Sequence, residues 1–207
     1  MEDIKIIKAD ESALEEVAKL ITDAFEQEGI SRYIHEFSKE GVKEVYYRGG
    51  LLKLRLALEV GEDILLAIKD DTIVGVAILK RGLKSSLAQK VKILFPEAIK
   101  FFFSIIIKIN LKKSFSIIKH VIPPKSLKKP YYTLEVIGVD PNYQGQGIGR
   151  KLLDEIHQIT ESNPEVSGVY LFADKKNKLI YEHFGYKVIK EGKGKDISIY
   201  HMFRENK

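Results

Sequence analysis

The chain has 207 residues, of which 44% are hydrophobic and 30% are charged, and it contains no cysteine. This length and composition suit one globular domain with a hydrophobic core, and they exclude a disordered or collagen-like chain. The lack of cysteine excludes disulfides, thiolate metal sites and a cysteine nucleophile. The N-terminal residues have no apolar run of the kind that forms a signal peptide, so we expect a cytoplasmic protein.

The first 60 residues predict one short strand and two helical regions. Residues 4–8 alternate apolar and polar side chains, which is typical of a strand. Asp10 and Ser12 are both good N-cap residues for the helix that follows, and Ser12 begins a capping-box pattern. Apolar residues then recur at helical intervals. We expect Gly29 to end this helix and a second helical region to follow over residues 31–60.

Residues 64–79 have the pattern of a β-hairpin. Two nearly continuous apolar runs, residues 64–68 and 73–79, flank the turn residues Asp70 and Asp71. Continuous apolar strands are typical of a sheet that is covered on both faces. We therefore expect this hairpin to lie inside a covered sheet.

Residues 80–129 differ from the rest of the chain in charge. They carry 13 Lys or Arg and one acid, Glu97, whereas the remaining residues carry 21 basic and 28 acidic side chains. The centre of the segment, residues 101–107, has six large apolar residues, far fewer than the roughly 20 that span a membrane. We expect a basic insertion of one or two amphipathic helices between the third and fourth strands.

The last third of the chain predicts alternating strands and helices. The expected elements are strand 131–139, turn 140–142, loop 144–149, a helix, strand 169–173, helix 179–184 and strands 188–189 and 197–203. The whole order is β-α-α-β-β, insertion, β-α-β-α-β-β. It predicts one mixed α/β domain over residues 1–207, with a largely antiparallel sheet of six to seven strands flanked by helices.

A glycine-rich loop joins strand 131–139 to the next helix, and it has the features of an anion-binding site. Its residues are Gln144, Gly145, Gln146, Gly147, Ile148, Gly149 and Arg150. Glycines bring successive backbone N–H groups together, and the first N–H groups of a helix lack internal partners, so both can bind a phosphate. The loop matches neither the dinucleotide fingerprint nor the phosphate loop of nucleoside triphosphatases.

The pattern that is present, Q-x-x-G-x-G, follows Val139-Asp140-Pro141 at the end of a strand. It resembles the acyl-CoA pyrophosphate loop of the GCN5-related N-acetyltransferase (GNAT) family. Residues 132–141 resemble the fourth strand of that family, and residues 177–186 resemble its N-x-x-x-Y-E-x-x-G-[FY] segment. The resemblance is specific over residues 131–189, weaker before residue 80 and absent over 80–129. It implies a GNAT-like fold, acetyl-CoA as co-substrate, and acetyl transfer to a primary amine by direct attack in a ternary complex.

The resemblance also implies two catalytic residues. Glu135 lies on the strand that leads to the loop, where many members of the family have a carboxylate, and we expect it to be the general base. Tyr181 stands where the family has a tyrosine that points at the CoA sulfur, and we expect it to protonate the leaving thiolate. From the residues alone, Glu135 could instead face solvent or make a structural hydrogen bond, and Tyr181 could only pack against the pantetheine arm.

Further contacts to CoA follow from the same resemblance. Ile137, Gly138 and Val139 end the fourth strand, which in the family splays from the fifth and leaves backbone groups free to pair with pantetheine. Gly138 would allow a bulge there. Asn177 is expected to contact the pantetheine or a phosphate, with a helix N-cap as its structural alternative.

The basic insertion leaves the third strand and returns to the strand of Glu135, so both of its ends adjoin the expected cleft. We expect residues 101–107 to form a helical cover over the acceptor side, whose charge would disfavour long polyamines. The alternatives are extra core on the sheet and a membrane-facing patch.

Two other classes of function stay open at this point. One is a non-catalytic CoA-binding or sensing module, and the other is a nucleic-acid or membrane-binding protein built on the basic segment. We expect no specific nucleic-acid partner, and peripheral membrane contact remains a minor alternative. The five histidines have no metal-ligand spacing, so no metal site is expected. The acceptor could be a small-molecule or a protein amine, and the protein a monomer or a homodimer.

Overall fold

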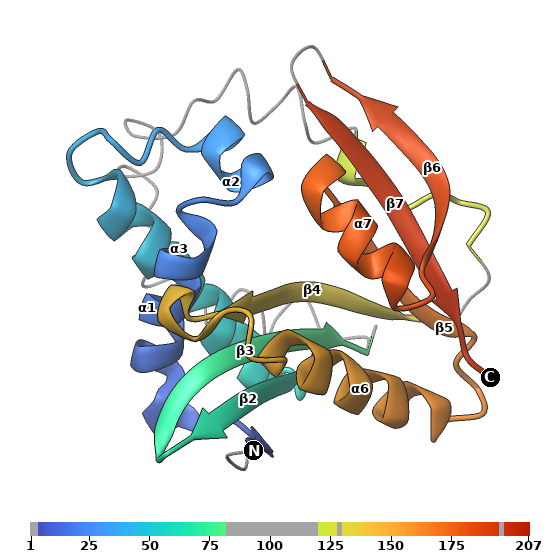
Figure 1. Cartoon of the computed structure of the whole chain (residues 1–207), viewed down its shortest axis with the longest axis horizontal. Coiled ribbons are helices and arrows are strands. Elements are labelled where there is room, and N and C mark those ends of the chain that lie inside the picture. The colour runs from blue at the N-terminus through green and yellow to red at the C-terminus, as the bar shows by residue number, and fades with distance from the viewer. Residues whose placement is uncertain (1–3, 82–119, 128–129, 195–196) are drawn as a thin grey trace.

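The computed structural model describes residues 4–81, 120–127, 130–194 and 197–207. These residues form one seven-stranded sheet in the order β1-β2-β3-β4-β5-β7-β6, with helices on both faces (Figure 1). The strands are β1 (Lys5–Lys8), β2 (Asp63–Lys69), β3 (Thr72–Lys80), β4 (Tyr132–Val139), β5 (Gly168–Ala173), β6 (Lys187–Lys193) and β7 (Ser198–Glu205). The helices are α1 (Leu14–Phe25), α2 (Gly29–Ile34), α3 (Val42–Glu59), α6 (Ile148–Glu161) and α7 (Lys175–His183). Every neighbouring pair of strands is antiparallel except β4 and β5, which confirms the predicted fold class.

The hairpin lies inside the sheet, as its apolar sequence predicts. Asp70 and Asp71 both have positive φ angles, of 49° and 58°, which is the backbone of a tight turn between twisted strands. In β2, Leu65 faces α6 and its neighbours Ile64 and Leu66 face α1 and α3. Helices cover both faces, so the two hydrophobic clusters lie on opposite sides of the same strands.

Of the two predicted N-cap residues, Asp10 acts as a cap, although of a short turn that precedes the first helix, and Ser12 does not. Asp10 caps a short 3₁₀ turn, η1 (Glu11–Ala13), where it accepts a hydrogen bond from the Ser12 N–H at 2.9 Å. The helix α1 then begins without a side-chain cap, so the predicted capping box is wrong. Because the 3₁₀ turn already orders this segment, Ser12 serves as a donor to Asp10 instead.

The glycine that was expected to end α1 instead begins α2. Gly29 is the first residue of α2, and Glu28 caps this helix. The Glu28 carboxylate accepts from the N–H groups of Ile30 and Ser31 at 3.0 and 2.7 Å. An acidic N-cap therefore starts a new short helix just after Phe25 ends α1.

The strands β4 and β5 run side by side over two residue pairs only, Tyr132 with Val169 and Thr133 with Tyr170. Beyond these pairs the strands diverge, and Figure 1 shows β5, β6 and β7 turning away from β4. The predicted splay is confirmed. It leaves backbone groups on one edge of β4 without a neighbouring strand.

A bulge interrupts the pairing of β3 with β4 at Glu135. Ile78 faces Val136 and the next residue, Leu79, faces Leu134, so Glu135 has no partner on β3. Gly138 pairs regularly with Val76, so the bulge that Gly138 would allow lies three residues earlier. The extra residue reverses the alternation of β4, because Leu134 and Ile137 pack on the α6 side and Val136 on the α1 side.

Most of the basic insertion lies outside the described residues. The predicted amphipathic helices, and the predicted cover formed by residues 101–107, fall in this part. Within the described ranges, no helix is both long and apolar enough to cross a membrane.

Candidate active site

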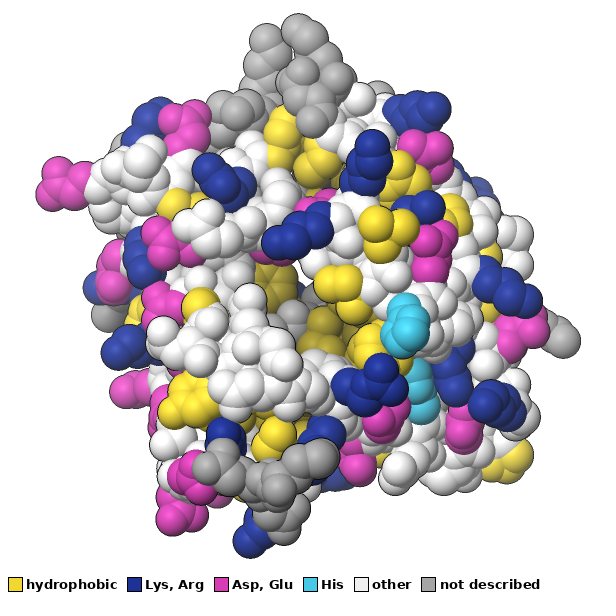
Figure 2. All heavy atoms as spheres, viewed as in Figure 1, with side chains coloured by type: hydrophobic (Ala, Val, Ile, Leu, Met, Phe, Trp, Pro, Cys, Tyr) yellow, Lys and Arg dark blue, Asp and Glu magenta, His cyan; other side chains and the backbone are white. Residues whose placement is uncertain are grey.

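A pocket of about 450 Å³ lies where the α1–α2 connection, the end of β4, the glycine-rich loop and α7 meet. Figure 2 shows a hollow near the middle of this face, with hydrophobic side chains at its edge. Most of the predicted site residues line the pocket: Ile137, Gly138, Val139, Gln144, Gly145, Gly147, Ile148, Gly149, Arg150, Asn177 and Tyr181. Two predicted residues, Glu135 and Gln146, do not line it.

The glycine-rich loop presents the start of α6 to the pocket. Gly145 and Gly147 both have φ of +80°, the left-handed conformation that side chains rarely adopt, and a Cβ on either would meet no atom within 4 Å. Gly147 is the N-cap of α6, where no side chain accepts a hydrogen bond from the helix. The first N–H groups of α6 therefore have no side-chain cap, and an anion can bind them.

One side chain of the loop, Gln144, holds the loop in place, and another, Arg150, adds positive charge. Gln144 donates from Nε2 to the carbonyl of Val139 at 3.3 Å, which ties the loop to the end of β4. The Arg150 guanidinium lies over the ring of Phe184, the residue after α7, 5.3 Å from the centre of the ring. Gln146 points elsewhere, because its Oε1 accepts from Lys69 at 3.0 Å. The backbone of the loop and Arg150 therefore form the part of the pocket that can bind a phosphate.

The phenol of Tyr181 lies at the α7 side of the pocket. Its ring meets the Tyr186 ring edge-on at 5.6 Å and packs against the α6-side cluster. Burial raises the pKa of the Tyr181 phenol, and the negative charges of Glu28 and Asp174 raise it further. The hydroxyl therefore keeps its proton at neutral pH, so a proton is present there, while the raised pKa makes the phenol a weaker acid.

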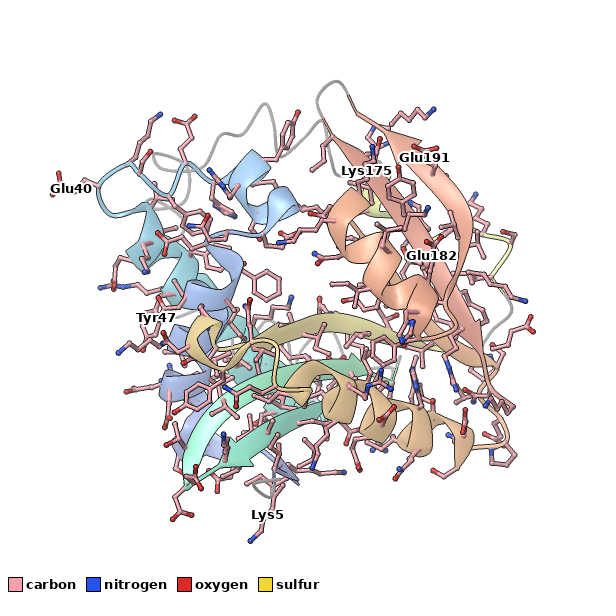
Figure 3. All side chains as sticks on the ribbon, viewed as in Figure 1. Lys5, Glu40, Tyr47, Lys175, Glu182 and Glu191 are labelled. Atoms are coloured by element: carbon pink, nitrogen blue, oxygen red, sulfur yellow. The ribbon has the colours of Figure 1, made fainter. Side chains whose placement is uncertain are left out.

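Two carboxylates in this pocket escaped the sequence analysis. Asp174 caps α7 by accepting from the Asn177 N–H at 2.8 Å, and Glu28 caps α2. The interpretation of Asn177 as an N-cap is wrong, since α7 begins at Lys175, four residues earlier than predicted. Figure 3 shows Lys175 and Glu182 near the two ends of this helix. An acidic residue just before a helix is a signal for an N-cap, and Asp174 has this position. The signal was missed because the helix begins with two lysines, Lys175 and Lys176, and the predicted helix started only at the apolar residues that follow.

The α1–α2 connection and α7 meet closely at one side of the pocket. A Cβ on Gly29 would overlap the Asp174 carboxylate, so only glycine fits at this position without displacing Asp174. The first residue of α2 and the cap of α7 are thus in contact across a wide gap in sequence. This contact holds both acidic caps near Tyr181.

The carboxylate of Glu135 lies outside the pocket and is 24% exposed. Its oxygens form ion pairs with Lys53 at 3.3 Å and Lys80 at 3.0 Å. The Lys80 contact lacks hydrogen-bond geometry, since Oε2 has no hydrogen-bond partner among the described residues. An amine that used Glu135 as a base would compete with two lysines, and this role of Glu135 stays a prediction. Within the described ranges, no group of three or more acids and histidines could hold a metal ion.

Comparisons with known proteins agree with this geometry. The family model described as acetyltransferase (GNAT) domain matches residues 120–188, which include β4, the loop, α6 and α7. No curated protein sequence matches the chain. A structure of histone acetyltransferase HPA2 and related acetyltransferase from Corynebacterium glutamicum is 17% identical, with a TM-score of 0.66 and coverage of 100% of this chain and 98% of that one.

Two further solved structures share the fold. The PaiA N-acetyltransferase of Thermoplasma acidophilum, in complex with coenzyme A, is 18% identical with a TM-score of 0.60. The match covers 98% of this chain and 99% of that chain. Salmonella typhimurium yncA, with its cofactor acetyl-CoA, is 13% identical with a TM-score of 0.56. The match covers 99% of this chain and 95% of that chain. At these low identities the structural similarity shows only that the fold is shared. The family model adds a match in sequence over the glycine-rich loop and α7. Residues 120–188 therefore match the GNAT family model, and the chain as a whole shares the fold of these acetyltransferase structures.

Proposed function

We propose that this protein transfers an acetyl group from acetyl-CoA to the nitrogen of a primary amine. The observation that supports this most is that one pocket joins an uncapped helix N-terminus, the open edge of β4 and the side chain of Tyr181. These are a site for phosphate, a site for an extended amide chain and a proton donor. Acetyl-CoA has a group for each of them: a pyrophosphate, a chain of amides and a leaving thiolate.

The residues fit the co-substrate without a change in the loop. The N–H groups at the start of α6 and the Arg150 guanidinium would bind the pyrophosphate. The backbone of residues 137–139 would pair with the amides of pantetheine as a neighbouring strand does, because β5 has moved away there. Asn177, which lines the pocket from α7, would contact the same arm. Solved structures of two proteins with this fold contain CoA or acetyl-CoA.

The chemistry follows from these positions. Acetyl-CoA supplies the thioester, whose carbonyl carbon bonds to the amine nitrogen as the C–S bond breaks. A backbone N–H at the end of β4 would polarise the carbonyl oxygen. Tyr181 would donate its proton to the departing thiolate, since its phenol is protonated at neutral pH. The proton that the amine loses would go to Glu135, directly or through water, after Glu135 exchanges a lysine contact for the amine.

A second candidate function is supported by the same ion pairs. A carboxylate held by two lysines also suits a CoA-binding module that performs no transfer. Calorimetric titration with CoA, followed by single-turnover transfer from labelled acetyl-CoA to a panel of amines, separates the two. Binding with transfer supports the acetyltransferase, and binding without transfer to any amine supports the module. A protein that binds neither CoA nor acetyl-CoA contradicts both.

A further inference from the structure

A second pocket, of about 290 Å³, adjoins the first one at Phe25. It lies between α1, α3 and the sheet, and its floor is formed by Ile78 and Val136. Phe25 lines both pockets, and its ring rests on Gly138 at the open end of β4. A molecule in the second pocket can therefore approach the proposed thioester position past one side chain.

The helix α3 has two adjacent glycines that face this pocket. Gly49 and Gly50 lie in the middle of an 18-residue helix, where glycine is the least favourable residue after proline. No packing contact requires glycine at position 50, since a Cβ there would meet no atom within 4 Å. The two glycines keep open a space that larger side chains would fill.

Three aromatic rings line the second pocket beside aliphatic side chains, and Lys53 is its one charged lining residue among the described residues. The His35 and Tyr46 rings meet edge-on at 5.0 Å, and Phe25 closes the side toward β4. Burial lowers the pKa of His35 and raises that of Tyr46 to about 12, so both are neutral at pH 7. The buried Nδ1 of His35 has no hydrogen-bond partner among the described residues.

On the side of the pocket next to Glu135, the net charge of the side chains is positive. Lys53 lines the pocket and, with Lys80, pairs with the single carboxylate of Glu135. Two ammonium groups on one carboxylate leave an excess of one positive charge. This arrangement disfavours an acceptor that carries a second ammonium group.

We propose that the second pocket, hereafter the aryl pocket, binds the aromatic group of the acceptor. The substrate class is then a primary amine that carries one aromatic ring on a short aliphatic chain. The ring would pack among Phe25, His35 and Tyr46, while the amino group extends past Phe25 toward the end of β4. This inference rests on the proposed acetyl transfer and specifies its acceptor.

The first test compares three amines with the wild-type protein. We expect kcat/KM for 2-phenylethylamine to exceed that for ethylamine at least 30-fold, because only the former fills the aryl pocket. Spermidine should be at least 10-fold poorer than 2-phenylethylamine. Equal values for 2-phenylethylamine and ethylamine, or a preference for spermidine, overturn the inference.

The second test fills the pocket from α3. Gly50→Leu should raise KM for 2-phenylethylamine at least 10-fold and leave KM for acetyl-CoA and for ethylamine within twofold. Gly50→Ala should raise the melting temperature and raise KM for 2-phenylethylamine about threefold, which keeps the test valid if the leucine variant folds poorly. Arg55→Leu is the control, because it places a leucine on the exposed part of α3. It should leave the KM values for 2-phenylethylamine, ethylamine and acetyl-CoA unchanged.

The two proposals fail in different ways. If CoA does not bind in a calorimetric titration, the proposed acetyl transfer is wrong. If CoA binds and amines are acetylated, but both Gly50 variants leave KM for 2-phenylethylamine unchanged, only the aryl pocket is wrong. An equal rise in KM for all amines in Gly50→Leu also contradicts the aryl pocket.

Discussion

The ring of Phe25 rests on the backbone of Gly138, where a Cβ would lie 3.3 Å from Cε2 of the ring. Phe25 ends α1 and Gly138 lies at the open end of β4, so this contact joins the helix layer to the splayed edge of the sheet. Because Phe25 lines both pockets, its position sets the width of the passage between them.

The first prediction concerns this contact. Gly138→Ala should raise KM for acetyl-CoA about 3- to 10-fold, because the new methyl group must displace the Phe25 ring by a few tenths of an ångström into the pocket. In the double variant Gly138→Ala/Phe25→Leu, the smaller side chain should restore part of the affinity. Steady-state kinetics checks this, and additive effects of the two changes would contradict the assigned contact.

The second prediction concerns the phosphate-binding loop. Gly147→Glu should weaken CoA binding at least 100-fold in a calorimetric titration, since it places a carboxylate where the phosphates would lie. Gly61→Glu is a matched control, because Gly61 has φ of +75°, also has open space around its Cβ and lies just beyond the end of α3. The two variants share the strain of a left-handed residue, about 1–2 kcal/mol, so equal CoA affinities would contradict the assignment of the loop.

Tyr181→Phe is expected to lower kcat about 10²-fold and to leave KM for acetyl-CoA within threefold, because a proton donor is lost and the ring remains. Tyr186→Phe is the control. Its hydroxyl lies 3.1 Å from Nε2 of His157, so this change should cost about 1 kcal/mol of stability and leave kcat unchanged. Equal kcat values for wild type and Tyr181→Phe would limit Tyr181 to packing.

Glu135→Gln tests the base against the purely structural ion pair. As a base, Glu135 should contribute about 10²- to 10³-fold to kcat, while its half-exposed ion pairs with Lys53 and Lys80 contribute at most about 1 kcal/mol to stability. We therefore expect a large fall in kcat with a small change in the free energy of unfolding. An unchanged kcat would assign the base to another residue.

Acid should destabilise the fold through His157, which is 8% exposed. Burial, with the nearby charge of Arg204, lowers the pKa of His157 to about 4. The unfolded chain binds this proton below about pH 6.5, whereas the folded chain binds it only near pH 4. The free energy of unfolding therefore falls as the pH decreases from 6.5 to 4.

For His157 this loss should reach about 2 kcal/mol, after allowance for partial solvent screening. In His157→Gln the loss over this pH range should be smaller by that amount. Urea unfolding of both proteins at pH 7 and pH 4 measures the difference, and parallel pH curves would contradict the assignment. The other histidines contribute equally to both proteins, so their effects cancel.

The order of elements and the glycine-rich loop could be predicted because their signals are local. The nearly continuous apolar runs of β2 and β3, the Asp70-Asp71 turn and the glycines before α6 are each signals carried by a few neighbouring residues. The place of the loop residues in the pocket could also be predicted from local signals, because the end of a strand, a tight turn and the start of a helix fix the backbone of the loop.

The parts of the site that sequence analysis missed depend on partners that are distant in the chain. The bulge at Glu135 results from pairing with β3, and no residue near it has a bulge signature. The ion pairs of Glu135 need α3 and the end of β3 to meet β4. Glu28 and Asp174 each cap a local helix, but their meeting near Tyr181 comes from the contact of Gly29 with Asp174.

Because the β4–β5 ladder has only two residue pairs, some backbone hydrogens in the middle of the sheet exchange with deuterium more readily than those of the fully paired strands. About every second N–H group of β4 points toward β5, and beyond Thr133 these groups have no strand partner in the described structure. Their isotope exchange needs no unfolding, whereas the amides between β2 and β3 exchange only when the sheet opens. When a ligand that contains amides pairs with this edge of β4, the N–H groups there should exchange slowly. Their exchange rates therefore report whether the space between β4 and β5 is occupied.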